Sequence, residues 1–232
     1  MITHLFPYDH YKFNSEFIFK SLPDDVLDIL LRNQEIRKYK QGETIFKENS
    51  RPMGIHKVES GLVKKSALGH EGKEHIFYFC TSGEFLGHRA LLSEEVNHDT
   101  SIAVLDSEVS FIPKADFLLA LKVSHLLCER IIKSLSHEFG VFIHRTQILS
   151  QHPVRERTAI ALLILLEKFK QVTPKQPIIE LTRNDLANFI GTAQETTVRI
   201  LHEFKDEGII DIQRRKIFVL DPGELKNISN YF

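Results

Sequence analysis

The spacing of apolar and polar residues changes twice along the chain. From about Tyr39 to Pro113, short apolar runs alternate with polar residues and are interrupted by Gly42, Gly61, Gly72, Gly83 and Gly87. Alternation is typical of strands with one buried face, and glycine suits the turns between them. These residues are therefore predicted to form an all-β barrel or sandwich.

A helix is predicted ahead of these strands, in "SLPDDVLDILLRN". Ser21 suits the N-cap of this helix, and Pro23 suits its first turn. The apolar stripe that would face the core comprises Val26, Leu27, Leu30 and Leu31.

After Pro113, apolar residues recur every three or four positions, with almost no Gly or Pro until about Ser150. This period predicts one long helix over 114–150 with a coiled-coil-like seam. The seam comprises Cys128, Ile131, Leu135, Phe139, Phe142, Thr146 and Leu149. It could pack on the β part of its own chain, but one small barrel cannot cover so long a helix. Self-association is therefore the favoured interpretation.

The third part of the chain begins near Pro153. It contains a strongly apolar helix ("RERTAIALLILLEKF"), a loop leading into a short strand ("PKQPIIELT") and a hairpin of two β-type runs ("IIDIQRRKIFVLD"). Between the strand and the hairpin lies "LTRNDLANFIGTAQETTVRILHEFKDEGII", residues 181–210. This segment carries the strongest functional signal in the sequence.

Two helix starts lie ten residues apart in that segment. Each matches the capping-box pattern, in which a hydroxyl residue is followed three positions later by a carboxylate. The first pair is Thr182 with Asp185, and the second is Thr192 with Glu195. A short helix, a tight turn through Gly191 and a second helix give the spacing of a helix-turn-helix.

The two faces of the second helix differ in character. Its apolar face comprises Thr197, Ile200, Leu201 and Phe204, which can close a small core with Leu186, Phe189 and Ile190 of the first helix. Its polar face comprises Gln194, Glu195, Val198 and Arg199. These residues lie in the first two turns, where a recognition helix meets base edges.

The side chains of the polar face suit the edges of DNA bases. Arg199 can form two hydrogen bonds with guanine, Gln194 can pair with adenine, and Glu195 can accept from cytosine. Val198 can lie against a thymine methyl group. A polar helix face is, however, more often just solvated, and a Glu195 engaged in a capping box would be less available to a base.

Further residues can contact the DNA backbone. Thr196, near a helix start, can bind phosphate alongside free backbone N–H groups. Thr182, at the start of the first helix, is placed with the DNA-binding residues, as are Arg214, Arg215 and Lys216 of the basic hairpin. Two capped helices followed by a basic hairpin form a more specific pattern than any single residue, and this pattern favours DNA binding.

Composition leaves DNA binding open and excludes other classes. Of the 232 residues, 42% are hydrophobic and 26% charged, which is typical of globular proteins, and the formal net charge is -1. A nearly neutral total does not argue against DNA, because binding needs only a local basic surface. Two cysteines, Cys80 and Cys128, are too few for a disulfide framework, a structural zinc site or a four-thiolate iron–sulfur cluster.

No apolar run in the sequence reaches the length needed to cross a membrane. The start, "MITHLFPYDHYKFNSEF", lacks the basic-then-apolar order of a secretory signal. The expected location is therefore the cytoplasm, with no membrane partner.

Nearly the whole chain resembles the Crp/Fnr family of bacterial transcription regulators. Residues 181–210 are similar to the family's helix-turn-helix, with its E-T-x-x-R core present as Glu195, Thr196 and Arg199. "GETIF", "VESGLVK" and "GEFLG" resemble its β-roll motifs, and the helix from about Ala115 resembles its dimerisation helix. The resemblance implies an α+β fold, with an N-terminal antiparallel β-roll of the cyclic-nucleotide-binding type, a long dimerisation helix and a C-terminal winged helix-turn-helix.

The resemblance also implies domains and partners. Residues 1–113 would form the β-roll domain with its N-terminal helix, 114–150 the dimerisation helix and 151–232 the DNA-binding domain. The chain would read a pseudo-palindromic site on double-stranded DNA as a homodimer, with RNA polymerase as a further candidate partner.

The resemblance also implies roles for particular residues. The dimer interface would comprise Cys128, Ile131, Leu135, Phe139, Phe142 and Leu149. Glu195 and Arg199 would read bases, but Gln194 stands where many members have Arg, so operator preference is not carried over.

The effector region departs from the family pattern. Cyclic-nucleotide binders resemble G-E-[LI]-[GAS] followed by R-[ST]-A, whose Glu holds the ribose and whose Arg neutralises the cyclic phosphate. Here His88 stands where the Glu belongs, and His98, Asp99 and Thr100 lie around the Arg position. Because a carboxylate repels phosphate, cAMP and cGMP are not expected to bind tightly.

Arg89 is the cation nearest to His88 in the sequence. It could serve an unidentified small anionic effector, or it could form an internal ion pair, which is the favoured interpretation. The candidate effector pocket comprises Gly83, Glu84, Phe85, Gly87, His88, Arg89, His98, Asp99 and Thr100.

Other cofactors have weaker support in the sequence. Haem would need axial ligands, and the only argument for His75 and His88 in that role is that both lie in the β region. Cys80 is interpreted as a small buried apolar residue, with a redox-sensing thiol as the alternative.

Two other classes of protein remain as alternatives. A metal-dependent enzyme on a cupin-like barrel would need a His-x-His or His-Glu constellation at ligand spacing, which the sequence lacks. Neither enzymatic activity nor a bound metal is therefore expected. A protein-interaction module built on the winged helix would expose an apolar patch on the second helix, but Val198 is the single apolar residue of that face.

Overall fold

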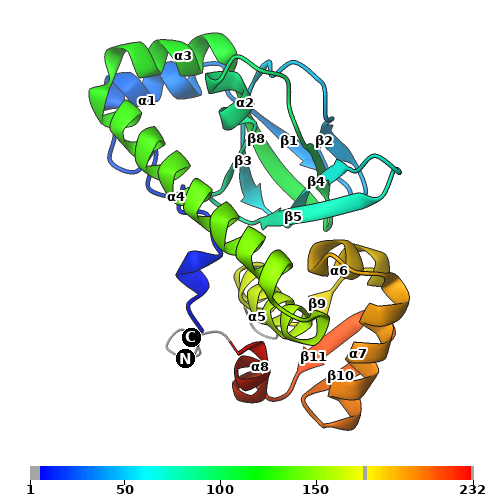
Figure 1. Ribbon diagram of the computed structural model, residues 1–232. Helices are drawn as coiled ribbons and strands as arrows, with labels where there is room; N and C mark the ends of the chain where they lie inside the picture. The colour runs from blue at the N-terminus through cyan, green and yellow to red at the C-terminus, as the bar shows by residue number, and fades with distance from the viewer. Residues whose placement is uncertain (1–5, 175–176, 231–232) are drawn as a thin grey trace. The chain divides into compact units, whose positions relative to one another are not determined.

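Figure 1 shows the structure of the chain, a computed structural model that describes residues 6–174 and 177–230. The first residues of "MITHLFPYDHYKFNSEF", the Lys-Gln pair of "PKQPIIELT" and the last two residues of the chain lie outside the described residues. The chain divides into two units, each with its own internal contacts. One comprises Phe13–Ala67 and Tyr78–Gly140; the other comprises the segment up to Lys12, Leu68–Phe77 and the chain from Val141 onward.

The alternating residues form two antiparallel sheets, as predicted. The strands are β1 (Glu35–Tyr39), β2 (Thr44–Phe46), β3 (Gly54–Ser60), β4 (Val63–Leu68), β5 (Glu74–Cys80), β6 (Phe85–Leu86), β7 (Thr100–Ala103) and β8 (Ser107–Pro113). They are ordered β1-β8-β3-β6 in one sheet and β2-β7-β4-β5 in the other. This arrangement is the predicted β-roll.

All five glycines that were assigned to turns have positive φ. Gly61, between β3 and β4, shows why: its φ is 94°, and a Cβ there would lie 2.2 Å from Ser107 Oγ. A side chain is therefore excluded on both backbone and steric grounds. Strand β1 was not predicted, because four of its five residues are exposed and no apolar alternation marks it.

Helix α1 (Asp24–Leu31) begins later than predicted. Its N-cap is Pro23, and Ser21 lies outside the helix with φ 54°, so the proposed Ser21 cap was wrong. Val26 and Leu30 are buried as predicted, but Leu31 is 45% exposed. Leu27, as predicted, and Ile29 pack against the core as partly buried residues.

The predicted continuous helix over 114–150 is wrong, because it consists of α3 (Lys114–Val123) and α4 (His125–Gln151). Ser124 separates them with extended dihedrals, φ -122° and ψ 102°. Its Oγ accepts a hydrogen bond from Leu127 N at 3.2 Å, which satisfies one of the free N–H groups at the start of α4. A serine can thus end one helix and cap the next without any Gly or Pro.

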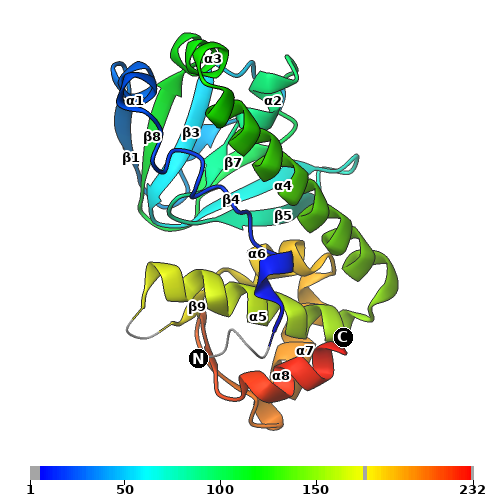
Figure 2. The ribbon, with the colours of Figure 1, turned by 90° about the vertical axis from the view of Figure 1, so that its left-hand side faces the viewer.

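The core of the β-roll unit lies between the sheet that contains β3 and β8 and the surrounding helices. Helices α1 and α3 lie side by side at one end of the roll (Figure 2). The short helix α2 (His88–Leu92), which was not predicted, packs against β3. The buried cluster comprises Ile18, Leu22, Val26, Leu30, Ile55, Phe85, Leu91, Ile112, Phe117, Ala120, Leu127 and Ile131.

The second unit holds the predicted winged helix-turn-helix. Its elements are the single-turn 3-10 helix η1 (Tyr8–His10), α5 (Val154–Val172), β9 (Ile179–Glu180), α6 (Arg183–Ile190), α7 (Gln194–Asp206), β10 (Ile210–Gln213), β11 (Lys216–Val219) and α8 (Pro222–Ser229). The small sheet has the order β10-β11-β9. Helix α8 was not predicted, although Asp221 accepts a hydrogen bond from Glu224 N and Pro222 opens the first turn.

Candidate nucleic-acid interface

The turn between α6 and α7 is set by the backbone of Gly191. Its dihedrals, φ 76° and ψ 46°, lie in the left-handed region that glycine adopts without strain. Its N–H and that of Thr192 both donate to Ala187 O, at 2.9 and 3.1 Å. These bonds close the C-terminus of α6 and confirm the predicted turn.

One of the two predicted capping boxes is present. Thr182 caps α6, since its Oγ1 accepts from Asp185 N at 2.9 Å. The second was wrong: the N-cap of α7 is Ala193, which provides no side-chain hydrogen bond. Thr192 instead serves the end of α6 through its N–H. The carboxylate of Glu195 has no hydrogen bond or ion pair with any described residue, so the cap does not engage it.

A small apolar core fixes how α7 is rotated against α6. Thr197, Leu201 and Phe204 are at most 1% exposed. They pack in the core that also buries Leu186, Phe189 and Ile190, as predicted. Because one face of α7 is buried against α6, its opposite face must meet solvent.

The outward face carries the predicted base-reading residues. Gln194, Glu195 and Arg199 are exposed, and Thr196 and Val198 are half-buried. The first hydrogen bond within this helix runs from Thr197 N to Ala193 O. The N–H groups before it therefore have no helical partner and can bind an anion.

Arg199 belongs to an ion-pair network that the sequence did not predict. Its guanidinium contacts Glu203, which also accepts from Arg155 Nη1 at 3.1 Å. Arg155 in turn contacts Glu207 at 2.7 Å and lies over the ring of Phe204 at 4.8 Å. Arg199 is 65% exposed, and such surface pairs are weak, so a DNA base can compete with Glu203 for it.

His202 is a second residue that was missed. It is exposed, and on α7 it lies seven residues after Glu195 and three residues after Arg199. Residues at these spacings share a helix face. Helical periodicity alone would have placed it with the outward residues.

The basic hairpin has its charged residues at the tip. Gln213 pairs with Lys216 across β10 and β11, and Arg214 adopts φ 57° in the turn. The side chains of Arg214 and Arg215 are exposed and form no ion pair with a described residue, whereas Lys216 Nζ lies 3.9 Å from Glu180. Arg183, at the start of α6, donates to Arg214 O at 2.9 Å and so ties the hairpin to the helix-turn-helix.

Two residues that the resemblance sets at the family's cyclic-nucleotide contacts, His88 and Asp99, are buried beside other polar side chains. His88 is 1% exposed, and its Nε2 lies 3.2 Å from Glu138 Oε1 on α4. Lys65 and Asp99 are also buried, with Nζ and Oδ2 3.8 Å apart. Burial opposes the charge of Glu138, yet His88 and Lys65 hold the pKa of its carboxyl below the ordinary value.

Several other residues of the candidate effector pocket have hydrogen bonds or ion pairs within the chain. Glu84 accepts from Thr81 N at 2.6 Å, and Thr100 Oγ1 accepts from Glu48 N at 3.0 Å. Arg89 forms the favoured ion pair, with Glu95 at 2.8 Å, but on the surface. Gly83 is a turn residue, Phe85 belongs to the core, and His98 is exposed with its ring 3.8 Å from Glu95. Cys80 is fully buried, as interpreted from the sequence.

The predicted dimer residues on α4 share one face of the helix but differ in exposure. Ile131 is buried in the β-roll core, and Leu135 packs against that core. Cys128, Phe142 and Leu149 are half-buried. Phe139 is 68% exposed, and Ile132 and Ile143 accompany it at 64% and 45%. These three residues form an exposed apolar stripe, and Leu126 near the start of the helix is a further exposed apolar residue at 37%.

Nowhere do three or more His, Cys, Asp or Glu side chains in the described part of the chain gather closely enough to hold a metal ion. Among its helices, moreover, none combines the length and the apolar character that a membrane crossing needs.

Two known domain families match the chain. Residues 36–123 match the cyclic nucleotide-binding domain, and residues 156–228 match the Crp-like helix-turn-helix domain. The chain is 26% identical over 212 residues to the cyclic AMP receptor protein of Thermus thermophilus, covering 91% of this chain and 96% of that protein. It is 24% identical over 214 residues to the fumarate and nitrate reduction regulatory protein of Escherichia coli, covering 90% and 82%.

Solved structures share the fold. FixK2 from Bradyrhizobium japonicum has a TM-score of 0.76 at 20% identity, covering 86% of this chain and 98% of that one. A Crp/Fnr-family transcriptional regulator from Thermus thermophilus has a TM-score of 0.72 at 24% identity, covering 85% and 99%. At these identities the likeness supports the arrangement of β-roll, long helix and winged helix, and not the ligand.

The two threonines that precede α6 and α7 provide a matched test of the capping. Thr182→Ala should lower the free energy of local opening of α6 by about 1 kcal/mol, because Asp185 N loses its acceptor. Thr192→Ala should change it by less than about 0.5 kcal/mol, since its side chain caps neither helix. Amide hydrogen exchange of α6 measures both. Equal effects of the two substitutions would contradict the assignment of the caps.

Proposed function

Because the chain belongs to the Crp/Fnr family of transcription regulators, we propose that it binds DNA sequence-specifically as a homodimer and regulates transcription. In this proposal α7 enters the major groove, and the two copies read the halves of a pseudo-palindromic site. The observation that carries the proposal is the outward face of α7, where an amide, a carboxylate and a guanidinium stand exposed within two turns of a helix start.

The proposal assigns the reading of bases to Gln194, Glu195 and Arg199, with Val198 against a thymine methyl group. Arg199 can fork onto guanine, Gln194 onto adenine, and Glu195 can accept from cytosine. The absence of a side-chain cap on α7 supports the role of Glu195, because no hydrogen bond with a described residue would have to be broken. For Arg199 the surface contact with Glu203 would be exchanged for a base.

Backbone contacts are assigned to residues on both sides of α7. Thr196 and the free N–H groups of the first turn of α7 suit one phosphate, and Thr182 lies at the start of α6. Arg214, Arg215 and Lys216 suit a neighbouring phosphate. Of these three, Lys216 is the weakest candidate, because Glu180 already lies close to its ammonium group.

Dimerisation is assigned to α4. Its exposed stripe, Ile132, Phe139 and Ile143, repeats at intervals of seven and four residues, as in the seam of a coiled coil. Exposed apolar rows of this kind are unusual on a monomer and mark interaction surfaces. A symmetric dimer through α4 would present two copies of α7 to half-sites about 34 Å apart, one helical turn of DNA.

The proposal includes a sensor domain that does not use cAMP or cGMP. The buried pairs His88–Glu138 and Lys65–Asp99 occupy the space and the charges that a cyclic nucleotide would need. A regulator of this kind would act in the cytoplasm, on chromosomal DNA, and would not be an enzyme.

Replacing Arg199 tests the reading of bases. Arg199→Ala should reduce discrimination at one base pair of each half-site by about 1–3 kcal/mol while leaving affinity for random DNA nearly unchanged. The operator is first found by selection from random duplexes, and binding is then measured on single-base variants. Lys122→Ala, on the exposed face of α3, is the control. An equal reduction of affinity for specific and random DNA would contradict a base-reading role.

The hairpin tip should behave differently. Arg214→Ala combined with Arg215→Ala should weaken binding to all sequences alike, because the two charges neutralise phosphates. The slope of log affinity against log salt should fall by roughly 1 for each phosphate that is no longer neutralised. Titrations at several salt concentrations measure this slope. An unchanged slope, or weakening confined to the operator, would exclude the assigned role.

The α4 stripe can be tested without DNA. Phe139→Ala should raise the dimer dissociation constant by about tenfold or more, because a large buried aromatic side chain dominates interfaces of this kind. Leu31→Ala, which removes an exposed leucine from α1, is the matched control and should have no effect. Analytical ultracentrifugation measures both. A dimer that tolerates Phe139→Ala as well as it tolerates Leu31→Ala does not form through this stripe.

A further inference from the structure

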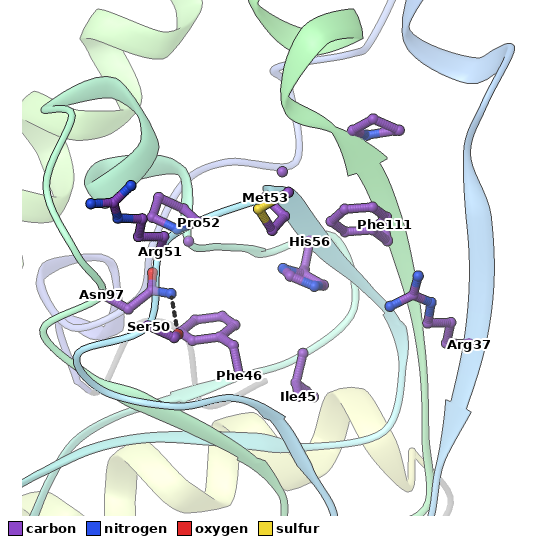
Figure 3. A pocket seen from close by; sticks show the side chains of 13 residues that line it. Arg37, Ile45, Phe46, Ser50, Arg51, Pro52, Met53, His56, Asn97 and Phe111 are labelled. Atoms are coloured by element: carbon purple, nitrogen blue, oxygen red, sulfur yellow. Dashed lines mark hydrogen bonds between the residues drawn. The ribbon is translucent and has the colours of Figure 1, made fainter.

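The β-roll contains an open pocket of about 510 Å³, and none of His88, Glu138, Lys65 and Asp99 lines it. Figure 3 shows His56 of β3 at its centre, with Phe46 of β2 and Phe111 of β8 on either side. Arg51 and Met53, from the connection between β2 and β3, lie at its edge. Pockets of this volume suit small organic ligands.

Two glycines keep the pocket open. A Cβ at Gly54 would lie 2.6 Å from Cε2 of Phe111 and 2.2 Å from Ile112 O, so no side chain fits there. Gly87 has φ 79°, and a Cβ there would point at the ring of Phe46 and at Nδ1 of His56, within 3.7 and 3.8 Å. A side chain at Gly54 would displace the ring of Phe111, and one at Gly87 would be strained by the positive φ.

The walls of the pocket are largely aromatic. The ring centroid of His56 is 5.5 Å from that of Phe46 and 5.0 Å from that of Phe111. His56 and Phe111 are also paired directly across β3 and β8, so the register of the sheet fixes their positions. Flat rings at these separations form a surface on which another flat ring can pack.

Two polar atoms in these walls are buried and unsatisfied. His56 is 91% buried and Asn97 is 98% buried, as their exposures of 9% and 2% show. Neither His56 Nδ1 nor Asn97 Oδ1 has a hydrogen-bond partner among the described residues. Asn97 is held in place through its other atom, since Nδ2 donates to Ser50 Oγ at 3.0 Å. Such atoms are costly to leave unpaired, and Asn97 Oδ1 can only accept.

The charge of the pocket is positive. Arg51 and Arg37 line it, and no Asp or Glu does among the described residues. Arg51 is exposed and has no ion pair with a described residue, while Arg37 is bound to Glu35 at 2.7 Å and stacks on Phe111. Burial, together with the charge of Arg37, lowers the pKa of His56 to about 4, so its ring is neutral at pH 7. Arg51 is thus the cation that remains available to an anion.

We propose that this pocket binds a small planar aromatic carboxylate that carries an N–H or O–H donor. The ring packs among Phe46, His56 and Phe111, the carboxylate meets Arg51, and the donor reaches Asn97 Oδ1. His56 offers a further polar atom to the ligand, as donor or acceptor according to its tautomer. His88, which follows Gly87 in the chain, does not line this pocket.

Three probes of nearly the same shape separate these contributions. Indole-3-carboxylate has the ring, the anion and the N–H donor. Indole-3-carboxamide lacks the charge, and 1-methylindole-3-carboxylate lacks the donor. Calorimetric titration of the full chain without DNA should show one site per chain for the first probe and at least about tenfold weaker binding of the other two. Because DNA is absent, failure of the proposed DNA-binding function would leave this result unaffected.

Variants connect the binding to the pocket. Arg51→Gln alters an exposed residue and should weaken the carboxylate about tenfold while leaving the carboxamide unchanged. Lys122→Gln, an exposed cation on α3, is the control and should bind like the wild type. His56→Phe, which keeps a flat ring and removes both nitrogens, should weaken all three probes, with circular dichroism and thermal melting as checks of folding.

Three results would overturn the proposal. One is the lack of saturable binding of indole-3-carboxylate at millimolar concentration. Another is equal affinity for the carboxylate and the carboxamide, or binding by Arg51→Gln that equals that by Lys122→Gln. The third is a nuclear magnetic resonance titration in which the shifted amides cluster away from His56, Asn97 and Arg51.

Discussion

The rotation of α7 about its own axis is the constraint on which the DNA-reading proposal depends. Burial of Leu201 and Phe204 stabilises one rotation by about 1.5–3 kcal/mol for each side chain. The polar face contributes little to choosing a rotation, because its residues are solvated in any outward position. The core that α7 shares with α6 therefore decides that Gln194, Glu195 and Arg199 meet solvent together. A substitution that loosened this core would disperse the three side chains without altering any of them.

The two sets of charged pairs in the chain differ in what they allow. Arg199–Glu203 is a surface pair, which is worth about 0–1 kcal/mol, so a base or phosphate can replace Glu203 at little cost. Lys65–Asp99 is buried, and removing one partner from such a pair costs about 3–5 kcal/mol. The same kind of interaction thus leaves Arg199 on α7 available to a ligand and holds Lys65 and Asp99 together inside the β-roll.

The elements that the sequence predicted well are those whose signal is local. The positive φ of Gly191 and the Thr182 cap can be read from single residues, and the strands from alternation. The errors arise where two local rules compete. Ser124 was read as a helix interior, but its hydroxyl caps α4; Thr192 was read as a cap, but its N–H closes α6. Both are short polar residues, which can serve either end of a helix, and only the tertiary packing decides between the two uses.

The open pocket could not be found from the sequence, for a different reason. Its polar atoms come from β3 and from the segment before β7, and its walls from β2 and β8, with no motif that joins them. Their convergence depends on the pairing of His56 with Phe111 and on the space left at Gly54 and Gly87. Comparison with a family concerns only the ligand positions of that family. The lack of the family's cyclic-nucleotide residues therefore says nothing about a second site in the same β-roll. The residues of that second site are brought together by the register of the strands.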